Sequence, residues 1–221
     1  MLQAHPDVLM HTHLAETCTS WPRWRPCSPG PRTTSTSMTA SASSARARCS
    51  PTPSTWTRPP WTASARAGAA VAFCPSSNLF LGSGLFDLKL ADRCGVKVGI
   101  GTDVGAGTSF SVLQTLGEAY KVCQLRGANL DPLRALYMAT AGGARALGIH
   151  ARVGALDVGQ EADFVVLDPA ATPLLARRTA GADMADVLFA LQILGDDRAV
   201  KSTYIKGRLA HARDGTRDDA E

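Results

Sequence analysis

Short apolar runs and helical apolar spacing alternate along most of the chain. The runs "AAVAFCPSSN" (69–78) and "VKVGIGTD" (96–103) each pass from buried-strand character into polar residues. Helical spacing is found in three segments, at 85–95, 111–125 and 131–148. In the last of these, Asp131-Pro132 favours a helix start and Gly148 a helix end. This alternation predicts a parallel sheet whose polar residues gather at the carboxyl ends of the strands.

Both ends of the chain carry further strand patterns. Residues 7–14 ("DVLMHTHL") have the pattern of a buried strand that ends in polar groups. After Gly148, two short strand patterns at 162–169 ("ADFVVLDP") and 202–211 ("STYIKGRLAH") are joined by glycine turns. We therefore expect a small β-layer appended to the α/β part.

Residues 17–67 differ in character from the rest of the chain. Ser, Thr and Pro fill 28 of these 51 positions, and Leu, Ile, Val, Phe, Tyr, Asp, Glu and Lys do not occur there. All four tryptophans and seven arginines of the chain lie in this segment. Without apolar periodicity it cannot build a core, so we expect a disordered or loosely held insert.

Composition narrows the class of protein. With 221 residues, 45% of them hydrophobic, the chain is long enough to bury a core. The six cysteines form no Cys-x-x-Cys pair and follow no signal peptide, so we expect free thiols in the reducing cytoplasm. No apolar run approaches the roughly 18 residues that a membrane helix needs, so we expect no membrane association.

Several motifs resemble the purine and pyrimidine deaminase branch of the amidohydrolase superfamily, in order and spacing. They are "HTHLAE" (11–16), "AFCPSSNLFLGSG" (72–84), "VGIGTDVGAGTSFSVLQTLGEA" (98–119), "ATAGGARALG" (139–148) with "VGALDVGQEADFVVLD" (153–168), and "GDDRAVKSTYIKGRLA" (195–210). The segments "CPSSNLFLGSGLF", "GTDVGAGTSFS" and "LGDDR" most resemble the guanine deaminases of that branch. The resemblance covers residues 1–16 and about 68–212.

The resemblance implies an α/β fold, namely the C-terminal part of a metal-dependent (β/α)8 barrel, strands 5 to 8, with a small appended β-sandwich portion. It divides the chain into four parts. These are the barrel strand 5 end (1–16), a low-complexity segment that we interpret as frame-shifted (17–67), the remaining barrel strands and helices (68–150), and a terminal helix with the β-sandwich portion (151–221).

The activity that this resemblance implies is metal-dependent hydrolysis of guanine to xanthine and ammonia. One divalent metal, zinc or alternatively iron, would lower the pKa of a bound water toward 7. His13 matches the strand-5 metal ligand, and Asp103 matches the strand-8 ligand that also accepts the proton of the water. Glu16 matches the carboxylate that protonates a ring nitrogen. The implied partners are a small purine, whose contacts stay unassigned, and a second copy in a homodimer.

Structural interpretations of these residues stay open beside the functional ones. Taken alone, Asp103 could cap the following helix, and Asn78 is either a turn residue or a link between a strand end and the site. His11 lies on the same side of a strand as His13, and we interpret it as a structural group. Cys74 and Cys123 lie in apolar runs and are interpreted as core thiols.

The implied ligand set is incomplete in this chain. A strand-1 His-x-His pair and a strand-6 histidine have no counterpart, since no histidine occurs between residues 14 and 149. We therefore expect the chain alone to be inactive.

A shifted reading frame would account for the missing strand-6 histidine. If the nucleotides of residues 17–67 are read one base earlier, many Ser and Thr codons become apolar, acidic or His codons. Arg32–Thr57 then yields an Ala-His that resembles the strand-6 segment of the family. We hypothesise two compensating indels.

Two alternative functions stay open. The first is another amidohydrolase, either chlorohydrolase-like or active on adenosine derivatives. The second is a non-enzymatic fragment whose arginines and tryptophans at 17–67 neutralise phosphates and stack on bases. An unstructured insert explains that segment more simply, so we expect no nucleic-acid partner.

Overall fold

The computed structural model describes residues 10–14, 38–42, 65–66 and 68–215, and for the first two ranges it describes the backbone alone. The first sheet has the strand order β1 (Met10–Leu14), β2 (Met38–Ala42), β3 (Ala70–Phe73) and β4 (Lys97–Ile100). β3 and β4 are parallel, as the strand-helix alternation predicts. β2 is antiparallel to both β1 and β3, so the expectation of a wholly parallel sheet is wrong on this side.

β2 also corrects one expectation about residues 17–67. Five residues of this segment form a strand, although we expected no regular structure there. The physical reason is that strands pair through backbone N–H and C=O groups, so a run without apolar periodicity can still pair with β1 and β3. Apart from this strand and residues 65–66, the segment lies outside the described residues.

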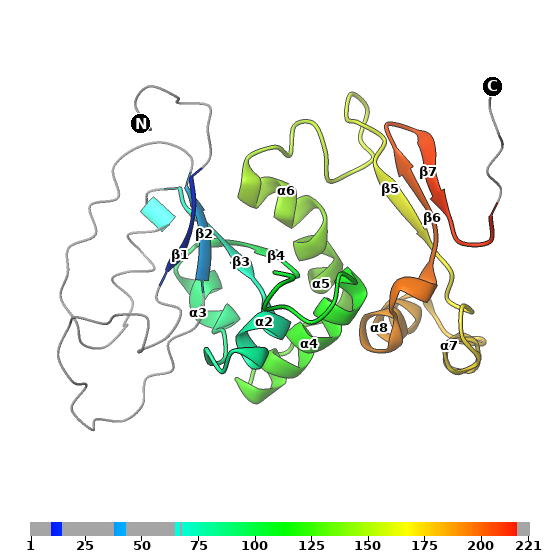
Figure 1. The fold of residues 1–221 in the computed structure, drawn as a ribbon, viewed down its shortest axis with the longest axis horizontal. Coiled ribbons are helices and arrows are strands. Elements are labelled where there is room, and N and C mark those ends of the chain that lie inside the picture. Colours follow the sequence, from blue (N-terminus) through cyan, green and yellow to red (C-terminus); the bar gives the residue numbers. More distant parts are fainter. Residues whose placement is uncertain (1–9, 15–37, 43–64, 67, 216–221) are drawn as a thin grey trace.

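The helices of residues 75–147 pack beside β3 and β4 or against one another (Figure 1). They are α2 (Pro75–Phe80), α3 (Leu88–Arg93), α4 (Val112–Leu125), α5 (Pro132–Ala139) and α6 (Ala141–Leu147). The predicted helix start and end are confirmed, because the Asp131 side chain accepts a hydrogen bond from the backbone N–H of Arg134 and Gly148 adopts a left-handed conformation.

Two helix predictions differ from the structure. The residues after β3 form the short helix α2 and not a polar turn, which Pro75 in its first turn favours. The single helix expected over 131–148 is divided at Thr140, whose φ of −125° and ψ of −105° are not helical. The structure therefore holds two helices, α5 and α6, where the apolar pattern predicts one.

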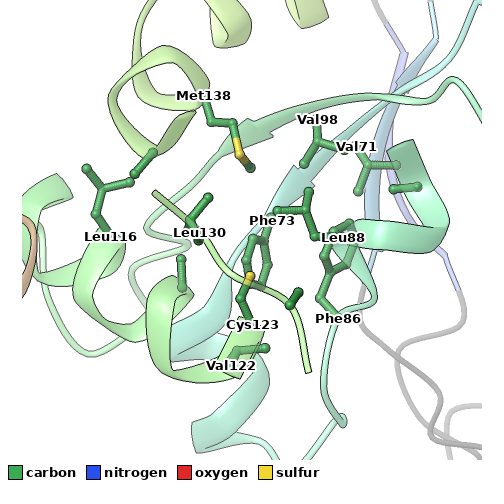
Figure 2. Packing of buried hydrophobic residues seen from close by; sticks show 14 of the residues in the cluster. Val71, Phe73, Phe86, Leu88, Val98, Leu116, Val122, Cys123, Leu130 and Met138 are labelled. Atoms are coloured by element: carbon green, nitrogen blue, oxygen red, sulfur yellow. The ribbon is translucent and has the colours of Figure 1, made fainter. Parts of the chain in front are cut away.

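Side chains from β3, β4 and the surrounding helices form the main core (Figure 2). Phe73 of β3 stacks on Phe86 with ring centroids 4.6 Å apart, and both side chains are fully buried. Cys123 of α4 and Met138 of α5 belong to the same cluster, with Cys123 beside Phe73 and Met138 at the opposite edge (Figure 2). Each large apolar side chain buried in this way contributes about 1.5–3 kcal/mol to the free energy of unfolding. This core fixes the carboxyl ends of β3 and β4 relative to each other.

The C-terminal part holds a second sheet, in the order β5 (Phe164–Leu167), β6 (Val200–Ile205) and β7 (Arg208–Ala212), with antiparallel pairs. α7 (Pro173–Thr179), α8 (Met184–Leu194) and the short helix η1 (Asp197–Ala199) lie between β5 and β6 in the chain. α8 packs against α4 and α5, which joins the two parts (Figure 1). The predicted β-layer is confirmed, but within residues 68–215 it is one sheet and no sandwich.

None of the helices that the structure describes is long and apolar enough to span a lipid bilayer.

Candidate active site

The carboxyl ends of the parallel strands β3 and β4 bring two polar side chains together. Ser77 lies four residues after β3, and Asp103 lies three residues after β4. The Ser77 hydroxyl Oγ donates a hydrogen bond to Oδ2 of Asp103 over 2.6 Å. The prediction that polar residues gather at these strand ends is confirmed for this pair, because adjacent parallel strands end at the same edge of a sheet.

Ser77 is held by the short helix α2. The backbone of α2 begins directly after β3, and Ser76, Ser77 and Asn78 are all buried in its first turn. Of these, Ser77 is fully buried and has Asp103 as its partner, whereas Ser76 Oγ and both side-chain polar atoms of Asn78 have no hydrogen-bond partner within the described part of the chain. Asn78 therefore belongs to the strand end but makes no side-chain hydrogen bond to Asp103.

Asp103 has an uncommon backbone conformation. Its φ of +48° lies in the left-handed region, where a non-glycine residue is rare. A tight turn holds it there, because the backbone N–H groups of Ala106 and Gly107 both donate to the carbonyl oxygen of Asp103. Gly107 is required in this turn, since a Cβ at this position would fall on the carbonyl oxygen of Thr102. Such strain concentrates at functional positions, so it marks Asp103 as a candidate.

The structural role considered for Asp103 does not match this geometry. The cap of α4 is Ser111, whose hydroxyl accepts the hydrogen bond from the backbone N–H of Gln114. The Asp103 carboxylate instead accepts from Ser77, and the aspartate is only partly buried. Among the described residues, none donates a hydrogen bond to its second oxygen, Oδ1. Within this part of the chain, the carboxylate thus has one oxygen held by Ser77 and one available oxygen.

The other predicted site residues are tested only in part. His11 and His13 lie in β1, in register with Ser41 and Thr39 of β2, so the expected strand is confirmed for their backbone. The structure does not describe their side chains. Glu16 lies outside the described residues. The proposed convergence of His13, Glu16 and Asp103 therefore stays a prediction.

The described residues do not by themselves form a metal site. No group of three or more His, Cys, Asp or Glu side chains lies close enough to hold an ion within the part of the chain that the structure describes. Zinc sites in proteins use at least three protein ligands. Asp103 is the one implied ligand whose side chain is described. Cys74 and Cys123 are buried in the core, which confirms their interpretation as core thiols.

A groove of about 630 Å³ lies near α2 but does not contain Asp103. Its walls come from α2, the loop before α4, one face of α4 and the end of α8. The residues that bind substrate stay unassigned, because neither Ser77 nor Asp103 lines this groove.

The sequence analysis missed Ser77. The residue stands in the "CPSSN" motif directly before Asn78, which was considered as a turn residue or as a link between the strand end and the site. The available signal was a serine in a polar run directly after a buried strand. That signal cannot choose among Ser76, Ser77 and Asn78, since the choice depends on how the first turn of α2 faces β4.

Comparison with known proteins decides the family. The profile of the amidohydrolase family matches residues 41–210. The chain belongs to the amidohydrolase family. Its α/β fold is accordingly part of the amidohydrolase fold, as the motifs "GTDVGAGTSFS" and "CPSSNLFLGSG" predict.

Individual amidohydrolases show how much of the family fold the chain contains. Guanine deaminase from Escherichia coli strain K12 is 51% identical over 154 residues, which are 69% of this chain and 35% of that enzyme. Its solved structure superposes with a TM-score of 0.68 and covers 69% of this chain and 36% of that one. The chain spans about a third of the length of the curated relatives it matches.

Two further solved amidohydrolase-fold structures agree. Guanine deaminase from Bradyrhizobium japonicum has a TM-score of 0.67 at 36% identity, covering 72% of this chain and 41% of that one. An adenosine deaminase from Xanthomonas campestris, solved with bound zinc, has a TM-score of 0.60 at 29% identity, covering 69% of this chain and 34% of that one. Relatives of this fold therefore include deaminases of more than one purine.

Proposed function

We propose that this chain is a portion of a guanine deaminase, a hydrolase that converts guanine and water to xanthine and ammonia. The observation that carries the proposal is the 51% identity over 154 residues to the guanine deaminase of E. coli. The contact between Ser77 and Asp103 supports it, because it presents a carboxylate at the strand ends, where barrel enzymes place their chemistry.

The finer fold assignment is part of this proposal. β1, β3 and β4 would correspond to barrel strands 5, 7 and 8, and the sheet β5–β7 to one layer of the β-sandwich portion. Strand 6 would be encoded by the alternative reading frame across residues 17–67, in place of the observed β2. The parallel pairing of β3 with β4 supports the assignment of strands 7 and 8.

The proposed chemistry uses this chain's carboxylates for proton transfer. Oδ1 of Asp103 would accept a proton from the attacking water as its oxygen bonds to the amino-bearing ring carbon. Glu16 would protonate the adjacent ring nitrogen. The proton held on Asp103 would then pass to the amino group, the carbon–nitrogen bond would break, and ammonia would leave. Glu16 would take up the remaining hydroxyl proton, which leaves the carbonyl group of xanthine and restores both carboxyl groups. The amidohydrolase family implies a divalent metal as well, but the described residues do not complete a metal site.

We propose zinc as that metal in the complete enzyme, with iron as the alternative, and His13 and Asp103 among its ligands. The bound zinc in the adenosine deaminase from X. campestris supports zinc. The small-molecule purine substrate, the homodimer, the absence of a nucleic-acid partner and the cytoplasmic location stay predictions. His13 and Asp103 are too few protein ligands to hold the metal that catalysis requires, so turnover of guanine by the 221-residue chain itself should be negligible.

A chimeric enzyme tests the proposal. The 154 residues of E. coli guanine deaminase that align with this chain are replaced by this chain's own residues, and xanthine and ammonia are measured. We expect guanine turnover within about tenfold of the E. coli enzyme, since half of the aligned residues are unchanged. The 221-residue chain is assayed beside it. A chimera that folds cooperatively and releases no ammonia from guanine would overturn the proposal, and release from adenosine derivatives would favour the alternative of another amidohydrolase.

A further inference from the structure

We propose that Ser77 is a positioning residue, which orients the carboxylate of Asp103 for proton transfer. The proposal deepens the proposed function and rests on it. The hydrogen bond from Ser77 Oγ to Asp103 Oδ2 measures 2.6 Å, in the range of charge-assisted hydrogen bonds between a hydroxyl and a carboxylate. It links two strand ends that are separated by 26 residues in the chain.

The rotation of the carboxylate is the property that this contact controls. The last side-chain torsion of aspartate has a broad, twofold preference, so an unrestrained carboxylate presents either oxygen. Ser77 is fully buried and its hydroxyl donates to Oδ2. With Oδ2 held, Oδ1 keeps one direction, and that oxygen is the one available to accept a proton.

The backbone of Asp103 is restrained by separate contacts. The turn through Gly107 fixes the main chain of Asp103 in its left-handed conformation, independently of Ser77. Backbone and side chain are thus held by different elements, the turn after β4 and helix α2. This division means that removing the Ser77 hydroxyl should free the carboxylate without releasing the turn.

Neighbouring serines show that burial alone does not explain the contact. Ser76 and Ser83 are also buried, and their hydroxyls have no hydrogen-bond partner among the residues that the structure describes. Burial in this short segment therefore does not by itself produce a hydrogen bond such as that of Ser77. Ser83 is a matched control for Ser77, because it has the same side chain and similar burial but does not touch Asp103.

The first experiment tests the contact in the full 221-residue chain, without any assay of activity. The chain is labelled with ¹³C at aspartate side-chain carboxyl groups, and the Asp103 signal is identified by its loss in Asp103→Asn. Ser77→Ala and Ser77→Cys should both shift this signal, because alanine has no donor and the thiol of cysteine is a weak one. Ser83→Ala should leave it in place. An Asp103 signal that is unchanged in both Ser77 variants would overturn the proposal.

The second experiment tests the consequence in the chimera described above. Ser77→Ala should lower kcat for guanine by about 10- to 100-fold, since misplacing a reacting group by about 1 Å has an effect of this size. KM should stay within about twofold, because the carboxylate acts in the transition state. Ser77→Thr, which keeps the hydroxyl, should restore most of kcat, and Ser83→Ala should change neither constant.

The outcomes separate the two proposals. If the unsubstituted chimera folds but does not deaminate guanine, the proposed function fails and the positioning role fails with it. If the chimera is active and Ser77→Ala keeps full kcat, the positioning role alone is wrong. If Ser83→Ala lowers kcat as much as Ser77→Ala, or Ser77→Thr does not recover it, the role of Ser77 is only structural packing.

Discussion

At the scale of single residues, burial decides which side chains are available for chemistry. Cys123 is 1% exposed among the apolar side chains of α4 and α5, whereas Cys94 at the end of α3 is partly exposed. Burial, with the nearby negative charges of Asp92 and Asp87, raises the pKa of the Cys123 thiol to about 11. A thiol is nucleophilic only as the thiolate, so Cys123 should be inert in the folded chain.

Alkylation measures this difference. At pH 8, a pKa of about 11 leaves roughly one Cys123 thiol in a thousand as thiolate, and burial also blocks the reagent. In the folded chain, iodoacetamide should label Cys94 and leave Cys123 unmodified, as read by mass spectrometry of the peptides. Both should react in urea. Equal labelling of both cysteines in the folded chain would show that the core around Cys123 opens readily.

At the scale of elements, the chain is closely packed where α5 is followed by α6. Gly142 lies in the first turn of α6, where an added Cβ would be 2.7 Å from the carbonyl oxygen of Tyr137. Helix propensity by itself favours alanine over glycine by about 1 kcal/mol. The two effects have opposite signs, so one substitution shows which is larger.

Gly142→Ala should lower the free energy of unfolding by about 1–3 kcal/mol, because the methyl group would overlap backbone that cannot move freely. Urea denaturation followed by circular dichroism measures it. An increase in stability would mean that α6 shifts to accommodate the methyl group and that the break at Thr140 is soft.

The second sheet is tied together by an ion pair. Asp168, which follows β5, accepts hydrogen bonds from the backbone N–H of Ala170 and from Nη2 of Arg213, which follows β7. The hydrogen bond from Ala170, then the one from Arg213, lower the pKa of Asp168 below its ordinary value of 3.8. Arg213 also donates to the carbonyl oxygen of Arg198, which lies just before β6, so it ties the three strands together at one end of this sheet.

This pKa shift predicts how stability depends on pH. A carboxyl group whose pKa is lowered in the folded state contributes stability above its unfolded pKa, and the contribution is lost as pH falls through the folded pKa. Asp168→Asn should therefore lower the thermal midpoint at pH 7, and the difference from the unsubstituted chain should shrink below pH 3.8. Asp157→Asn, at an exposed position, is the control. A difference that is constant between pH 7 and pH 3 would contradict the ionic role.

At the scale of the whole molecule, the described residues alone do not supply the ligands of the implied metal. Within the described residues, Asp103 stands without two further ligating side chains. A single carboxylate, or a carboxylate with one histidine, competes poorly with water for a divalent ion. Metal retention should therefore depend on residues that the relatives have beyond the aligned third.

Metal analysis of two proteins tests this expectation. The 221-residue chain should lose added zinc on gel filtration, whereas the chimera should retain stoichiometric zinc and lose its turnover of guanine on dialysis against a chelator. Asp103→Ala in the chimera should lower both metal content and turnover. Tight zinc binding by the chain alone would show that side chains outside the described residues complete a site.

The sequence by itself determined the local elements and the family. Apolar periodicity predicted β3, β4, α4 and the C-terminal strands, and Asp131 and Gly148 predicted helix ends, because these signals depend on near neighbours in the chain. The motifs around Asp103 and Asn78 placed the chain among the amidohydrolases, because they occur in the same order and with the same spacing as in that family.

Only the tertiary structure decided which polar residue meets which. Ser77 and Asp103 are 26 residues apart, and their contact depends on the parallel register of β3 and β4 and on the direction of α2. The antiparallel pairing of β2 with β1 and β3 depends likewise on contacts between distant segments. Periodicity in a sequence records which face of an element is buried. It does not record which element lies against that face.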